Sequence, residues 1–240
     1  MRDIVQALQS PPHPGYGRRC LSEMLGTYLL VFLGPGSVVA ASSLGFTGIE
    51  RLVLVAAVFG GTVAGVILLL GRQSGANINP AVTVGSTLAG VSERGLFLPY
   101  LVSQIAGGLL AGLTLKLAFG TLGSATSLGS TKLATGVSPI DGVALEMIGT
   151  FVLVVSALTA PTFVKSPPKQ AVLVGVTLFI LVLLIGPLTG ASFNPARSLG
   201  PSLFSGYLDN QAIYYIGPLI GGACAGLIFR RVRRIVGNEG

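Results

Sequence analysis

The sequence predicts an all-α membrane protein with six transmembrane helices, two re-entrant half-helices and an inverted internal repeat. Composition is the first of three observations behind this: of 240 residues, 51% are hydrophobic and only 10% are charged, whereas soluble domains have about 25% charged residues. The others are a series of long apolar runs and two segments that recur along the chain. We expect a single transmembrane domain over residues 1–240, with repeats at about 20–119 and 139–232 and a cytoplasmic tail at 1–19.

Six apolar runs follow one another along the chain. Each is long enough, or nearly so, to cross the hydrocarbon core of a bilayer as a helix. Closely spaced glycines inside them, such as Gly60-Gly61, suit helices whose backbones approach one another in lipid. The runs are Met24–Ala41, Leu52–Leu70, Gly95–Phe119, Val143–Ala160, Ala171–Ile185 and Ile213–Phe229.

The basic residues predict which way these spans cross. The net charge is +7, but the basic residues lie in the connections and at the ends rather than in one basic domain. With six crossings, most of them fall on one side, and the positive-inside rule makes that side cytoplasmic. We therefore expect both termini in the cytoplasm, a multi-pass protein of the plasma membrane, and no nucleic acid partner. The basic residues on that side are Arg2, Arg18, Arg19, Arg72, Arg94, Lys165, Lys169, Arg230, Arg231, Arg233 and Arg234.

The sequence has few features of a cleavable signal peptide, a catalytic site or a metal site. The proline-rich segment before Leu21 has no apolar core, so we expect no cleavable signal peptide there. His13 is the only histidine, and the sequence has no phosphate loop or nucleophile motif, so we expect no enzyme, no cofactor and no metal site. Cys20 and Cys224 both fall near the predicted cytoplasmic side, where we interpret them as small buried apolar residues rather than a disulfide.

Two segments of the first half recur in the second. Leu21–Val31 reappears as Ala144–Val154, and Ser74–Ala81 reappears as Thr189–Ala196. Each half holds three spans, an odd number, so the second half enters the membrane in the opposite sense. Such inverted repeats place their functional segments near the bilayer midplane, where the two Asn-Pro-Ala boxes are expected to face each other.

Each box predicts the start of a helix. The boxes consist of Asn79, Pro80 and Ala81, and of Asn194, Pro195 and Ala196. Asparagine caps the free amides of a first turn, and proline suits the first helical position because it has no amide hydrogen. The helical stretches that follow, 81–88 and 196–204, are too short to cross a membrane, so we predict two half-helices.

Together these residues resemble the aquaporin and glycerol-facilitator family, the major intrinsic proteins, of the orthodox or nodulin-26-like water-channel type. The resemblance covers both boxes, Arg197 after the second box, Gly217-Pro218 in the last span, and the Glu-x-x-Gly-Thr motifs that begin at Glu23 and Glu146. It implies a right-handed bundle of six tilted helices in which the half-helices meet at mid-membrane. It also implies a homotetramer with one pore in each subunit, and loop-supporting roles for Glu23 and Glu146.

The resemblance also implies four residues at an outer constriction: Phe59, Val182, Ala191 and Arg197. Strictly water-selective members commonly have His at the position of Val182 and Cys or Thr at that of Ala191. The smaller apolar residues here resemble the nodulin-26-like group, whereas Ser198, Tyr214 and Tyr215 resemble the water-channel pattern. Water is the favoured permeant, and broader passage of glycerol, metalloid hydroxides or ammonia is the main alternative.

Two features of the predicted pore are expected to exclude ions and protons. Two helix N-termini meeting at the centre bring positive dipole ends together, and the asparagine amides can donate to a passing water from both sides. Backbone carbonyls of 74–78 and 189–193 are expected to line the route. An ion-coupled transporter, the nearest alternative class, needs carboxylates within the membrane, and only Glu23 and Glu146 are available.

Overall fold

The computed structural model describes residues 15–237, and every regular element in that range is helical. Six helices are long and apolar enough to cross a membrane, and two are short. This arrangement confirms the predicted fold class. The long helices are α2 (Tyr16–Ser43), α3 (Gly48–Ser74), α5 (Phe97–Ala125), α6 (Pro139–Phe163), α7 (Pro167–Thr189) and α9 (Ile213–Gly237); the short ones are α4 (Pro80–Ala89) and α8 (Pro195–Ser205), with single 3₁₀ turns at η1 (Arg94–Leu96) and η2 (Ser127–Gly129).

The helices are longer than the apolar runs that predict them, because polar end turns stay helical. α9 continues through four arginines to Gly237 rather than ending at Phe229. α2 begins at Tyr16, so 16–19 belong to the first helix and not to the predicted tail, while residues 1–14, His13 included, lie outside the described part of the chain. Several helices end at a glycine with left-handed backbone, among them Gly75 after α3 and Gly190 after α7, a conformation that glycine adopts without steric cost.

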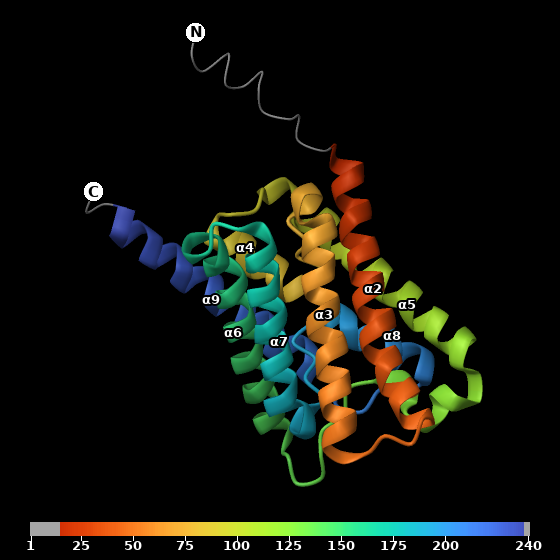
Figure 1. Cartoon of the computed structure of the whole chain (residues 1–240). Coiled ribbons are helices and arrows are strands. Elements are labelled where there is room, and N and C mark those ends of the chain that lie inside the picture. Colours follow the sequence, from red (N-terminus) through yellow and green to blue (C-terminus); the bar gives the residue numbers. More distant parts are fainter. Residues whose placement is uncertain (1–14, 238–240) are drawn as a thin grey trace.

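The helices pack as two halves with matching pairs of contacts. Within the first half α2 packs on α3 and α5, and within the second half α6 packs on α7 and α9. Across the halves α3 packs on α7, while each half-helix packs on the last long helix of the other half, α4 on α9 and α8 on α5. Figure 1 shows α4 towards the end of the bundle where α2 begins and α9 ends, and α8 nearer the opposite end.

Glycines make the contacts between the halves close. A Cβ atom at Gly60 of α3 would come within 2.5 Å of the Gly175 carbonyl oxygen of α7, and one at Gly175 would come equally close to the Gly60 carbonyl. Gly108 of α5 approaches the Ala196 carbonyl of α8 in the same way. Side chains larger than glycine would separate these helices, which explains the glycine pairs within the apolar runs.

The outer surface of the long helices is apolar, as lipid contact requires. Large hydrophobic side chains are exposed along them, for example Leu69 at 72% and Leu117 at 76%. The two cysteines are not buried as the sequence suggests: Cys20 is half-buried and Cys224 is exposed. Glycines and Ala225 form the inward face of α9 at this level, so Cys224 points outward.

Candidate functional site

The two Asn-Pro-Ala boxes lie together in the middle of the fold. Asn79 and Asn194 each cap their own half-helix, because their side-chain oxygens accept hydrogen bonds from the amides of Ala81 (2.8 Å) and Ala196 (3.0 Å). Each side-chain amide then reaches across to the other box: Asn79 Nδ2 donates to the carbonyl of Phe193 (2.7 Å), and Asn194 Nδ2 donates to the carbonyl of Ile78 (3.0 Å). Both asparagines are buried.

The segments that lead into the boxes have an unusual backbone. Ala76 and Ile78 in the first, and Ala191 and Phe193 in the second, have φ between 46° and 52°. A left-handed backbone at residues other than glycine costs roughly 1–3 kcal/mol each and persists only where surrounding contacts fix it. These loops therefore need strong support from the helices around them.

Two buried carboxylates supply that support. Glu23 of α2 accepts hydrogen bonds from the amides of Asn77 (3.0 Å) and Ile78 (2.6 Å). Glu146 of α6 accepts the equivalent pair in the second loop, from Ser192 (2.9 Å) and Phe193 (2.7 Å). Both carboxylates are fully buried, and such charge-assisted bonds offset much of the cost of desolvating a carboxylate.

The glycine of each Glu-x-x-Gly-Thr motif makes room for the same loop. A Cβ atom at Gly26 would come within 2.5 Å of the Ile78 side chain, and one at Gly149 would meet the Phe193 ring. The carboxylate thus holds the loop backbone while the glycine one helical turn later accommodates a loop side chain. The spacing within the motif follows from this geometry.

A second set of supports comes from residues for which the sequence pattern did not predict this role. Tyr100 donates to the carbonyl of Ser74 (2.8 Å), and Tyr214 donates to the carbonyl of Thr189 (2.9 Å), at the start of each loop. Gln104 donates to the Glu23 carboxylate (2.8 Å). A repeat signal for the tyrosines exists in the sequence, because each lies seven residues before a glycine pair, at Gly107 and Gly221.

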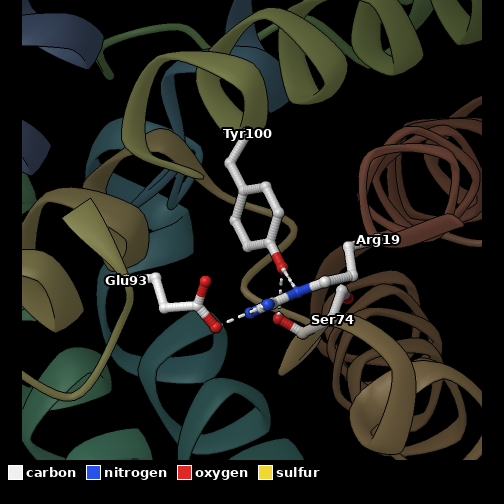
Figure 2. A network of polar contacts seen from close by, with 4 residues as sticks. All are labelled: Arg19, Ser74, Glu93 and Tyr100. Atoms are coloured by element: carbon white, nitrogen blue, oxygen red, sulfur yellow. Dashed lines mark hydrogen bonds and ion pairs between the residues drawn. The ribbon is translucent and has the colours of Figure 1, made fainter. Parts of the chain in front are cut away.

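The first loop has a further anchor near the end of the bundle where α2 begins. Arg19 donates from Nε to the Tyr100 hydroxyl (3.2 Å) and from Nη1 to the Glu93 carboxylate (2.6 Å). Figure 2 shows the guanidinium of Arg19 between Glu93 and Tyr100, with the Ser74 carbonyl beside the tyrosine hydroxyl. This network connects the start of α2, the segment before α5 and the end of α3.

Two cavities enter the fold from opposite ends. The inner cavity, about 540 Å³, is lined by both asparagines and extends to Gln170 and Arg233, at the end of the bundle where α2 begins and α9 ends. The outer cavity, about 650 Å³, is lined by residues of the opposite end, including Arg51 and Lys132. Phe59 and Arg197 line both cavities, so the route between the cavities passes these two side chains.

At this junction the structure brings together three of the four residues named from the family pattern. The guanidinium carbon of Arg197 lies 4.9 Å from the centre of the Phe59 ring, within cation–π distance, and Val182 lines the outer cavity beside them. Ala191 is buried between Gly190, which lines the outer cavity, and Ser192, which lines the inner one; its own side chain lines neither.

Arg197 is fixed but keeps a free donor. Its Nη1 donates to the Gly129 carbonyl (2.9 Å), and the side chain is 3% exposed. Its buried Nε has no hydrogen-bond partner within residues 15–237. A buried donor without an acceptor costs free energy unless water or a bound molecule accepts from it.

Comparisons with known proteins agree with this architecture. The sequence profile described as "Major intrinsic protein" matches residues 12–229. The chain is 38% identical to Aquaporin TIP4-4 of Zea mays (90% of this chain, 86% of that protein), and 34% identical to Aquaporin NIP1-2 of Oryza sativa subsp. japonica (89% and 71%).

More distant relatives share the same plan. Aquaporin AqpM of Methanothermobacter marburgensis is 30% identical (89% of this chain, 96% of that protein). The X-ray structure of the aquaglyceroporin from Plasmodium falciparum has the same fold, with a TM-score of 0.78 at 23% identity (91% and 96% covered). The profile match over most of the chain, together with two half-helices joined through their asparagines, shows that this chain belongs to the major intrinsic protein family of membrane channels.

Proposed function

We propose that the chain is a passive channel that conducts water and excludes ions and protons. The observation that carries this proposal is the reciprocal bonding of Asn79 and Asn194 at the wall of the inner cavity, where both half-helices begin. An amide nitrogen has two hydrogens, and each asparagine uses one on the opposite box. The second is left for a passing water.

The charge pattern at this point supports exclusion. The N-termini of α4 and α8 meet through their capping residues, so their positive dipole ends oppose a cation or a hydronium ion. A water that accepts bonds from both asparagine amides turns its hydrogens towards its neighbours on either side. The chain of waters that would relay a proton is then interrupted.

We propose Phe59, Val182, Ala191 and Arg197 as the selectivity filter. Arg197 places a positive charge where the two cavities meet, and we expect its guanidinium to donate to the permeant. Val182 gives this junction an apolar wall on the side of the outer cavity, which also suits the carbon skeleton of a small polyol. That wall favours the second candidate, a broader channel for glycerol, ammonia or metalloid hydroxides. Ala191 is included by its place in the family pattern, although its side chain lines neither cavity.

Glu23 and Glu146 act as structural supports in this proposal. All the bonds described for their carboxylates go to loop amides and to fixed side chains, so neither is poised to bind and release a coupling ion. Transport is therefore passive, without catalysis and without an ion gradient.

Stopped-flow light scattering of proteoliposomes tests this function directly. Water permeability above that of empty liposomes, unchanged when a sodium or proton gradient is imposed, is the expected result. A glycerol permeability comparable to that of water would establish the broader channel instead. Solute uptake that requires an ion gradient would contradict passive transport.

The assembly and placement of the channel are also proposals. We propose a homotetramer in the plasma membrane, each chain forming one transmembrane domain with its own pore. The end of the bundle where α2 begins and α9 ends carries most of the basic residues, and the positive-inside rule makes it cytoplasmic. Protease cleavage of tagged termini in intact cells and chemical crosslinking in membranes would test orientation and subunit number.

A further inference from the structure

The last two turns of α9 differ from the rest of the helix. Figure 1 shows them extending away from the other helices, and the residues from Arg231 to Val236 are all exposed. Four of the eight residues at 230–237 are arginines, and within residues 15–237 none of these arginines forms an ion pair. This segment, the α9 extension (Arg230–Gly237), therefore leaves its charge and its side chains without protein partners.

The α9 extension has two faces of opposite character. Starting from Ile228, just before the extension, apolar side chains recur at the spacing of one helix face, i, i+4, i+7 and i+8. They are 51–66% exposed: Ile228, Val232, Ile235 and Val236. Arg230, Arg233 and Arg234 lie at i, i+3 and i+4, so they share the opposite face of the helix. A soluble helix would bury the apolar face, but in the described fold nothing covers it.

These features fit a membrane interface. A helix with an apolar face and a cationic face lies with the first in the acyl boundary and the second among the headgroups. Arginine is suited to this because its guanidinium forms two parallel hydrogen bonds with a phosphate. Clusters of basic residues directly after a transmembrane helix also attract the anionic lipids of the cytoplasmic leaflet.

The extension also borders the proposed permeation route. Arg233 and Phe229 line the inner cavity together with Gln170, at the start of α7, and Ser92, in the connection after α4. A headgroup held by the arginines would therefore lie beside the opening of that cavity. This position distinguishes the extension from basic residues that serve only to orient the chain in the membrane.

We propose that the α9 extension is an interfacial anchor that binds the headgroups of anionic phospholipids beside the opening of the inner cavity. The occupant is a lipid rather than a soluble phosphate because the apolar face needs acyl chains to cover it. This inference is independent of which solute the channel conducts.

Lipid retention by the purified full chain tests the proposal. The protein is reconstituted in equal amounts of phosphatidylglycerol and phosphatidylcholine, extracted in mild detergent, and its bound lipids are counted by native mass spectrometry. We expect phosphatidylglycerol to predominate. Replacing Arg230, Arg231 and Arg234 with Gln should reduce the preference by more than tenfold, because each basic residue near an anionic surface contributes about fivefold.

A matched variant distinguishes lipid binding by the α9 extension from a general attraction of anionic lipids to basic residues. Arg72→Gln, Lys165→Gln and Lys169→Gln together remove three charges from the same end of the bundle, outside the extension, and should leave the preference intact. An equal loss in both triple variants, or no preference in the wild type, would overturn the proposal. Should the arginine variant fail to fold, the wild type in 1 M NaCl serves instead, where the screening length falls to about 3 Å: a preference that persists there contradicts binding through the arginines.

Discussion

Asn79 and Asn194 exchange hydrogen bonds through each other's loops, each side-chain amide donating to the carbonyl of the residue that precedes the other asparagine. The same two side chains cap α4 and α8 through their oxygens. Each asparagine therefore uses both ends of its amide, one to start a helix and the other to join the two halves of the channel. An amide side chain offers a neutral acceptor and donors on one planar group, and asparagine is the amide short enough to cap a helix.

Asn79→Asp separates these two functions. Aspartate still caps α4, but it cannot donate to the Phe193 carbonyl, and it places a negative charge where cations are to be excluded. We expect lower water flux and a measurable proton leak, seen with a pH-sensitive dye trapped in proteoliposomes. Asn210→Asp, the same change at an exposed turn, is the control. Liposomes that remain proton-tight with Asn79→Asp would contradict the proposed role of the amide.

Val182→His tests the filter. The larger polar ring narrows the junction beside Phe59 and Arg197, so glycerol flux should fall by about tenfold or more while water flux falls less. Val182→Leu adds bulk without polarity and shows which property matters. In a glycerol-permeable wild type, an unchanged glycerol rate with Val182→His would place Val182 outside the filter.

Glu146→Gln should destabilise the second loop. The carboxylate accepts from two loop amides and from Thr189, whereas glutamine offers one oxygen and turns an NH2 group towards donors. The cost is about 1–3 kcal/mol for each buried group left unpaired. Thermal aggregation in detergent should begin at a lower temperature, with reduced water flux. The exposed Glu50→Gln provides a comparison, and equal behaviour of the two variants would argue against a supporting role.

Gly60→Ala should disturb the contact between the halves, whereas Gly61→Ala should not. A Cβ at Gly60 would meet the Gly175 carbonyl, while one at Gly61 would meet no atom within 4 Å. The expected cost at Gly60 is about 1–3 kcal/mol, visible as lower thermal stability and lower yield of folded protein. The neighbouring glycine controls for helix propensity, so a similar loss in both variants would show that packing is not the cause.

Mercury should inhibit the wild type only weakly. Cys20 is half-buried and Cys224 is exposed on the outer surface, and neither lines the inner or the outer cavity. A mercury adduct on either thiol would leave the junction at Phe59 and Arg197 open. Strong inhibition that persists after both cysteines are replaced with serine would contradict this.

Much of the fold follows from local patterns in the sequence. Apolar runs locate the long helices, and Asn-Pro starts the half-helices, because both depend on nearby residues alone. Helix ends are less predictable: the arginines after Phe229 end the apolar run but not α9, since backbone hydrogen bonding continues through polar residues. The outward position of Cys224 likewise depends on which face of α9 packs inward.

The detailed geometry of the candidate site depends on long-range contacts that no local pattern encodes. The left-handed backbone of Ala76 and Phe193 goes against the preference of these residues, and it is set by carboxylates on distant helices. The roles of Tyr100 and Gln104 become visible only when α5 lies against the first loop. Ala191 matches a filter position of the family by its spacing in the sequence, but spacing does not determine where a side chain points. Its side chain lines neither cavity.

The packing of α4 on α9 has a consequence for biosynthesis. Gly222 and Gly226 of α9 hold the backbone of Ala81 and Gly85 in close contact, yet 123 residues of chain lie between Ala89 and Ile213. At about 5–20 residues per second, the ribosome takes roughly 6–25 s to make that stretch. The first half-helix therefore waits in the translocon or the bilayer without its main partner until α9 has been synthesised.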